Sequence, residues 1–268
     1  MIKSKFTLVF TILMPPVLAT LLYFYLIARD SWYGPVLSSH QAEIVYIKRD
    51  TNFDQFIDQL KDRGWLESPE VTRWYARLVM KNRRLCFGEY WLKPGMTLDN
   101  LVDNIVNARG MVNHHITFIE GWTFRQLRRA LDDDPAIEHD TVAISDREIM
   151  SKLGHTGQQP EGRFFPDTYQ FYYGVSDLVI LQQSYMKMQS LLKQKWLSRE
   201  KRLPYATPYS ALIVASLIES EAVVDKDREK IASVIVNRMR RKMPLQIDPT
   251  VLYGLNKVYG SPISRKDL

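Results

Sequence analysis

The chain has 268 residues, of which 46% are hydrophobic and 12% aromatic. This composition supports a sizeable buried core and excludes a largely disordered chain. The formal net charge of +6 suits an anionic polymer, an anionic membrane surface or a nucleic acid, so charge alone does not select a partner. The single cysteine, Cys86, excludes an intramolecular disulfide, so the fold depends on its core.

The N-terminal stretch Phe6–Ala28 contains no charged residue and follows Lys3 and Lys5. A helix needs about 20 apolar residues to cross the bilayer, so the stretch predicts a membrane anchor over residues 1–30. A cleaved signal peptide is the alternative, but its apolar core is shorter, about 7–15 residues. Because lysines precede the stretch, we expect a single pass through the inner (plasma) membrane, with a cytoplasmic N-terminus and a periplasmic or extracellular body.

Residues 42–112 have the patterns of a small α/β module, which follows a short polar linker at residues 30–41. Apolar spacing predicts, in chain order, a strand, two helices, a strand and a helix over residues 43–50, 52–65, 68–80, 86–95 and 97–109. Thr97 is the expected N-cap of the last helix.

Residues 113–268 predict a second, mixed α+β domain. The patterns indicate a strand over 113–121, a helix over 123–133, a loop region with a short helix over 134–159 and an aromatic strand over 160–174. Three helices follow over 176–203, 209–224 and 225–243, and then a turn-rich stretch over 244–254. Asp225 is the expected N-cap of the helix over 225–243.

No metal or other cofactor is expected from the sequence. His114 and His115 are adjacent on a predicted strand and point to opposite sides, which is poor geometry for a shared metal ion. The sequence also has no CxxC, HExxH or glycine-rich phosphate loop.

Two glutamates, Glu219 and Glu221, interrupt a stretch that is apolar on nearly all sides and predicts a buried helix. Side chains two positions apart on a helix point about 200° apart, so at most one carboxyl faces a given cleft. This argues against a two-carboxylate glycosidase pair built from these residues alone. Burial would raise the pKa of such a carboxyl toward a value useful for a general acid. The alternative is that both are structural, one of them paired with a base such as Arg228.

Residues 215–254, ASLIESEAVVDKDREKIASVIVNRMRRKMPLQIDPTVLYG, resemble the core signature of the YceG/MltG-type endolytic murein transglycosylases, and EGRFFPDTYQFYYG at 161–174 resembles their aromatic motif. The resemblance implies cleavage, without water, of the β-1,4 bond between N-acetylmuramic acid and N-acetylglucosamine in nascent peptidoglycan strands. Such cleavage leaves 1,6-anhydro ends and terminates strand elongation. The resemblance further implies a LysM-like glycan-binding module at 42–112, peptidoglycan synthases as candidate partners and no nucleic-acid partner.

The family works with one catalytic glutamate, and its pattern places Glu221 on that position. Glu219 falls on the accompanying acidic position, where it would orient or pair. The resemblance assigns substrate contacts to five more residues, with hydrogen bonds from Gln246, Asp248 and Thr250 and ring stacking by Phe165 and Tyr169. The alternative for these residues is ordinary turn structure or core aromatic packing.

The family continues past the segment that ISRKDL at 263–268 matches, so we expect the catalytic domain to be incomplete at its C-terminus. Three functions stay open. They are a membrane-anchored lytic transglycosylase, a non-catalytic glycan-binding or scaffold protein of the cell-wall machinery, and a muramidase that hydrolyses the same bond.

Overall fold

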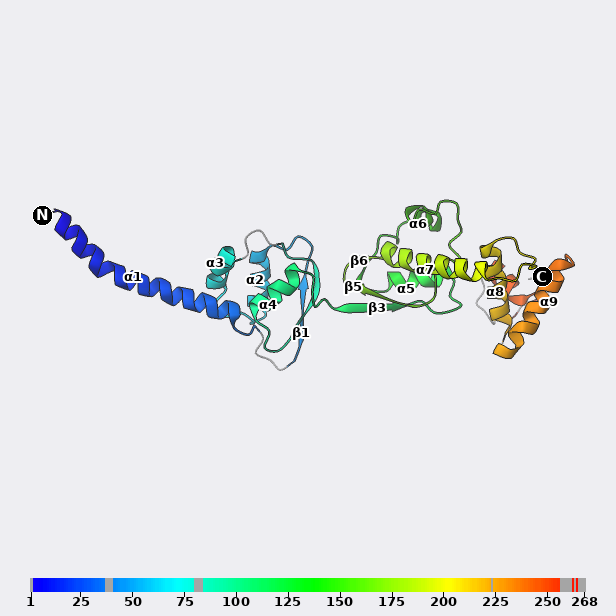
Figure 1. Cartoon of the computed structure of the whole chain (residues 1–268), viewed down its shortest axis with the longest axis horizontal. Coiled ribbons are helices and arrows are strands. Elements are labelled where there is room, and N and C mark those ends of the chain that lie inside the picture. Colours follow the sequence, from blue (N-terminus) through cyan, green and yellow to red (C-terminus); the bar gives the residue numbers. More distant parts are fainter. Residues whose placement is uncertain are drawn as a thin grey trace. The chain divides into compact units, whose positions relative to one another are not determined.

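The computed structural model describes residues 2–36, 41–79, 84–222, 224–255, 262 and 264, with side chains from residue 14 onward. The chain divides into two compact units, residues 1–114 with 172–174 and residues 115–171 with 175–268. Each combines helices with short strands (Figure 1), so the predicted mixed α+β class is confirmed. The matched end segment ISRKDL lies almost entirely outside the described residues.

The first helix, α1 (Ile2–Tyr33), contains the stretch predicted as a membrane anchor. The side chains of residues 1–13 lie outside the described part. Among the residues that the structure describes, no helix is both long enough and apolar enough to cross a bilayer. The anchor thus stays a prediction from the sequence.

The C-terminal turns of α1 belong to the core of the first unit. Trp32 is 2% exposed, and its indole Nε1 donates a hydrogen bond to Asp99 Oδ1 at 2.8 Å. Ala28 and Val36 are also buried. The interpretation of residues 30–41 as a polar linker is therefore wrong for the first part of this segment. The segment is polar on average, but the Trp32 ring is buried while its N–H donates to a carboxylate.

The remaining first unit follows the predicted order of a strand, two helices, a strand and a helix: β1 (Glu43–Ile47), α2 (Phe53–Asp62), α3 (Pro69–Val79), β2 (Gly88–Leu92) and α4 (Leu98–Val106). Strands β1 and β2 are antiparallel, from Glu43 opposite Leu92 to Ile47 opposite Gly88. Thr97 is the N-cap of α4, and its side chain accepts from Asn100 N at 3.1 Å, as predicted.

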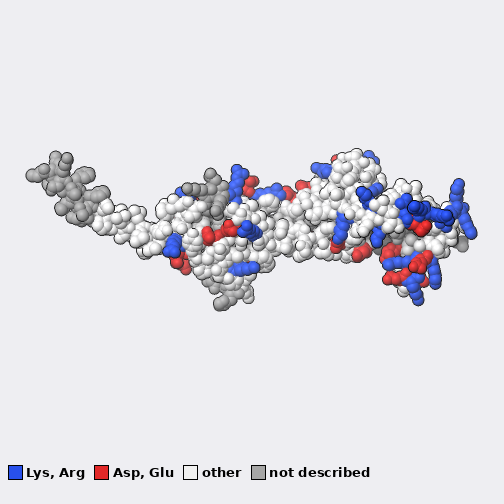
Figure 2. Space-filling model, in the orientation of Figure 1, with Lys and Arg blue, Asp and Glu red and all other residues white. Residues whose placement is uncertain are grey.

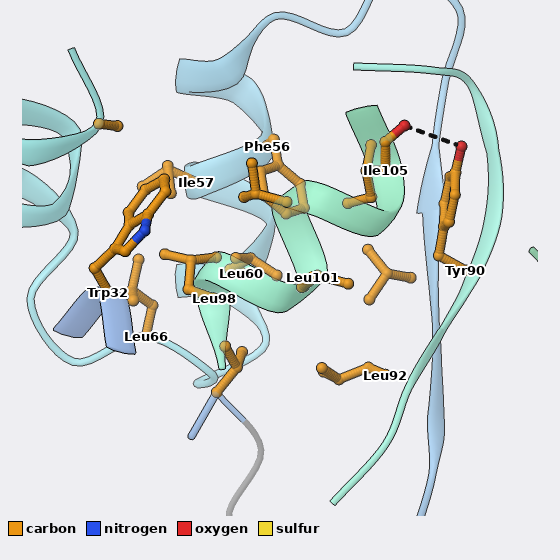
Figure 3. Close-up of a cluster of buried hydrophobic side chains, with 14 of the residues drawn as sticks. Trp32, Phe56, Ile57, Leu60, Leu66, Tyr90, Leu92, Leu98, Leu101 and Ile105 are labelled. Carbon is orange, nitrogen blue, oxygen red and sulfur yellow. Dashed lines mark hydrogen bonds between the residues drawn. The ribbon is translucent and has the colours of Figure 1, made fainter. Parts of the chain in front are cut away.

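The core of this unit brings the apolar faces of α2 and α4 together with the inner side chains of β1 and β2 (Figure 3). Phe56, Leu60 and Leu101 are fully buried there. Tyr90 is also buried, and its hydroxyl donates to Cys86 O at 3.1 Å, which satisfies the polar end of the ring. Burial raises the pKa of Tyr90 to about 12.

The second unit contains four short strands and six α-helices among the described residues: β3 (Asn113–Thr117), α5 (Phe124–Asp132), β4 (Ile137–Glu138), α6 (Asp146–Lys152), β5 (Thr168–Tyr172), β6 (Val175–Ser176), α7 (Asp177–Leu197), α8 (Pro208–Glu221), α9 (Arg228–Arg240) and α10 (Asp248–Gly254). Strand β3 pairs with β5, and β4 pairs in parallel with β6. Ser176 is the N-cap of α7, accepting from Leu178 N at 3.2 Å.

Two predictions in this unit are wrong in detail. Asp225 does not cap α9, because Asp225–Asp227 forms the 3₁₀ turn η1 and α9 begins at Arg228. The stretch 244–254 is not turn throughout, since α10 occupies most of it. Pro249 lies in the first turn of α10, where the missing N–H has no intrahelical partner to lose.

Candidate functional site

Helix α8 carries both glutamates of the sequence motif and begins at a well-defined cap. The Thr207 side chain accepts from Ser210 N at 3.1 Å, and Pro208 occupies the first turn. The helix contacts α7, α9 and α10, and Val214 joins Ile235 and Ile247 in a small core.

The prediction that α8 is buried on all sides is wrong. Val214 is its one fully buried residue, and Ile213 on the same helix is 46% exposed. Apolar composition reports how many side chains favour burial, whereas the number of neighbouring elements determines how many are covered. Glu219 and Glu221 are both exposed, so the burial expected for them is absent.

Glu219 is held by an arginine from the next helix. Arg228 Nη2 lies 2.9 Å from both Glu219 Oε1 and Oε2, and Arg228 Nη1 lies 3.3 Å from Asp225 Oδ1. Figure 2 shows basic and acidic side chains gathered over the α8 and α9 region. The pairing with Arg228 is the one considered in the structural alternative.

Glu221 is the last residue of α8 and is followed by the C-cap Ala222. Its side chain is exposed and makes no hydrogen bond or ion pair with the described part of the chain. Of the two glutamates, Glu221 is thus the one whose exposed carboxylate has no partner in the described part of the chain.

The predicted polar contacts cluster at the start of α10. Gln246 adopts a left-handed backbone conformation, with φ of 55°, and its Oε1 accepts from Arg238 Nη1 at 3.2 Å. Thr250 Oγ1 donates to Ile247 O at 2.6 Å, while Asp248 is exposed at the first position of the helix. Contact between α10 and α8 places these residues in the same helical cluster as the glutamates.

The two predicted stacking residues lie elsewhere in the second unit. Tyr169 is 7% exposed, its ring centroid lies 5.1 Å from that of Phe118, and its hydroxyl donates to Phe165 O at 2.6 Å. The ring of Tyr169 is therefore packed in the core, as in the core-packing alternative, and its stacking on a sugar stays a prediction. Phe165 is half-buried, with Lys187 Nζ 5.2 Å from its ring centroid.

Glu161 is a half-buried carboxylate close to α8 and α10 that the sequence analysis did not single out. Its two carboxylate oxygens each lie 3.2 Å from Phe124 N at the start of α5, and its carboxylate also hydrogen-bonds the side chain of Tyr253 on α10. Its backbone oxygen accepts from Tyr209 Oη on α8 at 2.9 Å. Glu161 therefore ties three helices to the aromatic motif. The one signal in the sequence was that Glu161 is the first residue of the aromatic motif at 161–174.

Burial raises the pKa of the Glu161 carboxyl, and the hydrogen bonds from Phe124 and Tyr253 only partly oppose this effect. A raised pKa means that the folded chain keeps this proton to a higher pH than the unfolded chain. The free energy of unfolding that Glu161 contributes therefore falls as pH rises from the ordinary glutamate pKa, about 4.3, through the raised folded value.

We expect Glu161→Gln to remove this part of the pH dependence of stability. The thermal midpoint of the native chain, relative to that of the variant, should fall as the pH rises above about 4.3. Glu148→Gln is a matched control. Hydrogen bonds from Ser145 lower the pKa of Glu148, so the contribution of Glu148 to stability rises with pH, opposite to that of Glu161. A difference between native chain and Glu161→Gln that is constant with pH would contradict the expectation. The measurement is thermal unfolding of all three chains at a series of pH values.

The second unit is thus an α+β domain with an exposed, carboxylate-bearing helical site at α8 and α10. The chain belongs to the YceG-like family, whose model matches residues 45–268.

Curated relatives share part of the chain. An endolytic murein transglycosylase of Bacillus subtilis (strain 168) is 31% identical over 186 residues, which are 63% of this chain and 51% of that protein. An endolytic murein transglycosylase of Streptococcus pneumoniae serotype 2 (strain D39) is 32% identical over 176 residues, 62% of this chain and 29% of that protein. The matched part spans about half, or less, of these relatives.

A crystal structure of a YceG-like protein from Listeria monocytogenes also resembles the chain. Its sequence identity is 23% and its TM-score 0.45, and the match covers 85% of this chain and 80% of that one.

Proposed function

We propose that the chain is an endolytic lytic transglycosylase that cleaves the β-1,4 bond between N-acetylmuramic acid and N-acetylglucosamine in nascent peptidoglycan. Membership of the YceG-like family and the names of the curated relatives support this activity. The observation that carries the assignment of residues is the different state of the two glutamates. Glu219 is paired with Arg228, whereas Glu221 ends α8 with an exposed, unpaired carboxylate among the described residues.

One carboxyl is sufficient for this reaction. Protonated Glu221 gives its proton to the glycosidic oxygen as the bond to C1 of the muramoyl residue breaks. The Glu221 carboxylate then takes the proton of the muramoyl C6 hydroxyl while that oxygen attacks C1, which closes the 1,6-anhydro ring. The proton returns to Glu221, no water is consumed, and the carboxyl is ready for another cycle.

Two further features of the second unit fit this proposal. Arg228 holds Glu219 and Asp225 together at the C-terminal end of α8. Asp248 on α10 is exposed and offers a hydrogen-bond acceptor for sugar hydroxyls. We further propose that residues 42–112 are a LysM-like module that binds or places the glycan strand, and that synthases of the elongation and division machinery are partners.

The test is mass spectrometry of uncross-linked glycan strands after incubation with the full chain. Products that end in 1,6-anhydro-muramic acid are the expected result. Reducing ends that carry an added water would indicate a muramidase instead. Intact strands that co-sediment with the chain would indicate a glycan-binding or scaffold protein.

Membrane attachment is a proposal that rests on the sequence, with the N-terminus in the cytoplasm. The exposed apolar side chains of α1, among them Leu18, Leu21 and Leu22, support it. We expect the full chain to stay in the membrane pellet after alkaline carbonate extraction, and a chain with Leu18, Leu21 and Leu22 changed to Asp to be released. Release of the unchanged chain would contradict the attachment.

A further inference from the structure

We propose that Asp132, His139 and Asp177 form a binding site for a divalent transition-metal ion such as Zn²⁺, outside the α8 and α10 site. One ligand atom of each residue lies within 4.8 Å of the others. All three belong to the second unit. The site combines two carboxylates with an imidazole, a ligand set that Zn²⁺ and its first-row neighbours accept.

The topology of the second unit explains how residues 45 positions apart along the sequence meet. Strands β4 and β6 are parallel, with Ile137 opposite Val175 and Glu138 opposite Ser176. His139 directly follows β4, and Asp177 directly follows β6 as the first residue of α7, so the register sets these two residues side by side just past the ends of the strands. Asp132 arrives from the last position of α5.

Asp177 supplies a second observation that points to an ion at this site. Its side chain is 0% exposed, and Oδ2 accepts from Thr141 N at 3.0 Å and from Thr141 Oγ1 at 2.6 Å. Oδ1 is buried with no hydrogen-bond partner among the described residues. A buried carboxylate oxygen without a partner is costly, and native proteins satisfy nearly all such atoms.

The cluster also has no basic partner among the described residues. In the described part of the chain, Asp132, His139 and Asp177 form no ion pair with lysine or arginine within 4.0 Å. Asp132 and His139 are exposed while Asp177 is buried, so an ion can enter from solvent and reach the unpaired oxygen. In tetrahedral coordination, bonds of about 2.0–2.2 Å place the ligand atoms on one Zn²⁺ about 3.4 Å apart. The ligand atoms lie within 4.8 Å of one another, so the most distant pair has to close by no more than about 1.4 Å.

The ion would join three parts of the second unit, since its ligands come from the end of α5, the end of β4 and the start of α7. Three protein ligands leave room for water in the remaining positions of the metal. Because the ion would join these three elements, we expect metal binding to stabilise the folded chain.

The experiment titrates the metal-free full chain with zinc sulfate and measures binding by calorimetry and the thermal midpoint with and without zinc. We expect one zinc per chain and a higher midpoint with zinc. His139→Ala and Asp177→Asn should each weaken binding at least about 10-fold and lose the thermal shift. Asp133→Asn and His115→Ala are matched controls from outside the cluster and should leave both readouts unchanged.

Asp177 also accepts hydrogen bonds from Thr141, so Asp177→Asn can destabilise the fold without any effect on metal binding. His139 is exposed, so His139→Ala is the variant that tests whether the cluster binds zinc. No saturable zinc binding by the native chain would overturn the proposal. Zinc binding that His139→Ala leaves unchanged would overturn it as well. Ca²⁺ prefers an all-oxygen shell and should bind more weakly than Zn²⁺, so calcium binding that is tighter than zinc binding would also refute the assignment.

Discussion

Replacing Glu221 by Gln is expected to lower the rate of 1,6-anhydro-product formation by about 10²–10⁴-fold, the usual contribution of a positioned general acid or base. Gln keeps the size of the side chain but cannot give or take the proton. The side chain is exposed and makes no polar contact with the described residues, so the substitution should leave the thermal midpoint unchanged. Product formation is measured by mass spectrometry of digested glycan strands.

Glu219→Gln is the matched comparison, two residues away on the same helix. It breaks the pair with Arg228, and exposed ion pairs of this kind contribute only about 0–1 kcal/mol. We expect a smaller loss of rate, within about 10-fold, because Glu219 would orient the site without exchanging protons. A complete loss of product in Glu219→Gln, together with a normal rate in Glu221→Gln, would mean that Glu219 transfers the proton and Glu221 does not.

Replacing Trp32 by Ala is expected to destabilise the first unit by about 3–5 kcal/mol, the usual cost of removing a large buried aromatic side chain. Trp32 is 2% exposed, and its ring centroid lies 5.8 Å from that of Tyr75 on α3. The substitution also leaves Asp99 Oδ1 without its indole donor. Chemical denaturation, followed by circular dichroism, measures the change.

Trp74→Ala is the control, because Trp74 is 50% exposed on α3. Its cost should stay near or below about 1 kcal/mol, since a partly exposed ring loses little burial. Equal costs for the two variants would mean that the end of α1 is not part of the core.

Local signals in the sequence predicted most of the first unit and α7 correctly. The alternation in β1, the helical spacing in α2 and the Thr97 cap are properties of neighbouring residues, and the structure keeps all three. Trp32 was missed because a single buried ring within a polar segment has no periodic pattern to reveal it. Its partner Asp99 is 67 positions away along the chain.

The sequence by itself determined the family, the Glu-x-Glu motif and the opposed directions of its two side chains, because helical geometry needs no other part of the chain. Only the tertiary structure decided that α8 is covered on one side, that Glu219 rather than Glu221 is paired with Arg228, and that Tyr169 is a core residue. The tertiary structure also places Glu161 next to Tyr253 and His139 next to Asp177. These outcomes depend on which distant segments pack together, and burial and ion pairing are properties of that packing.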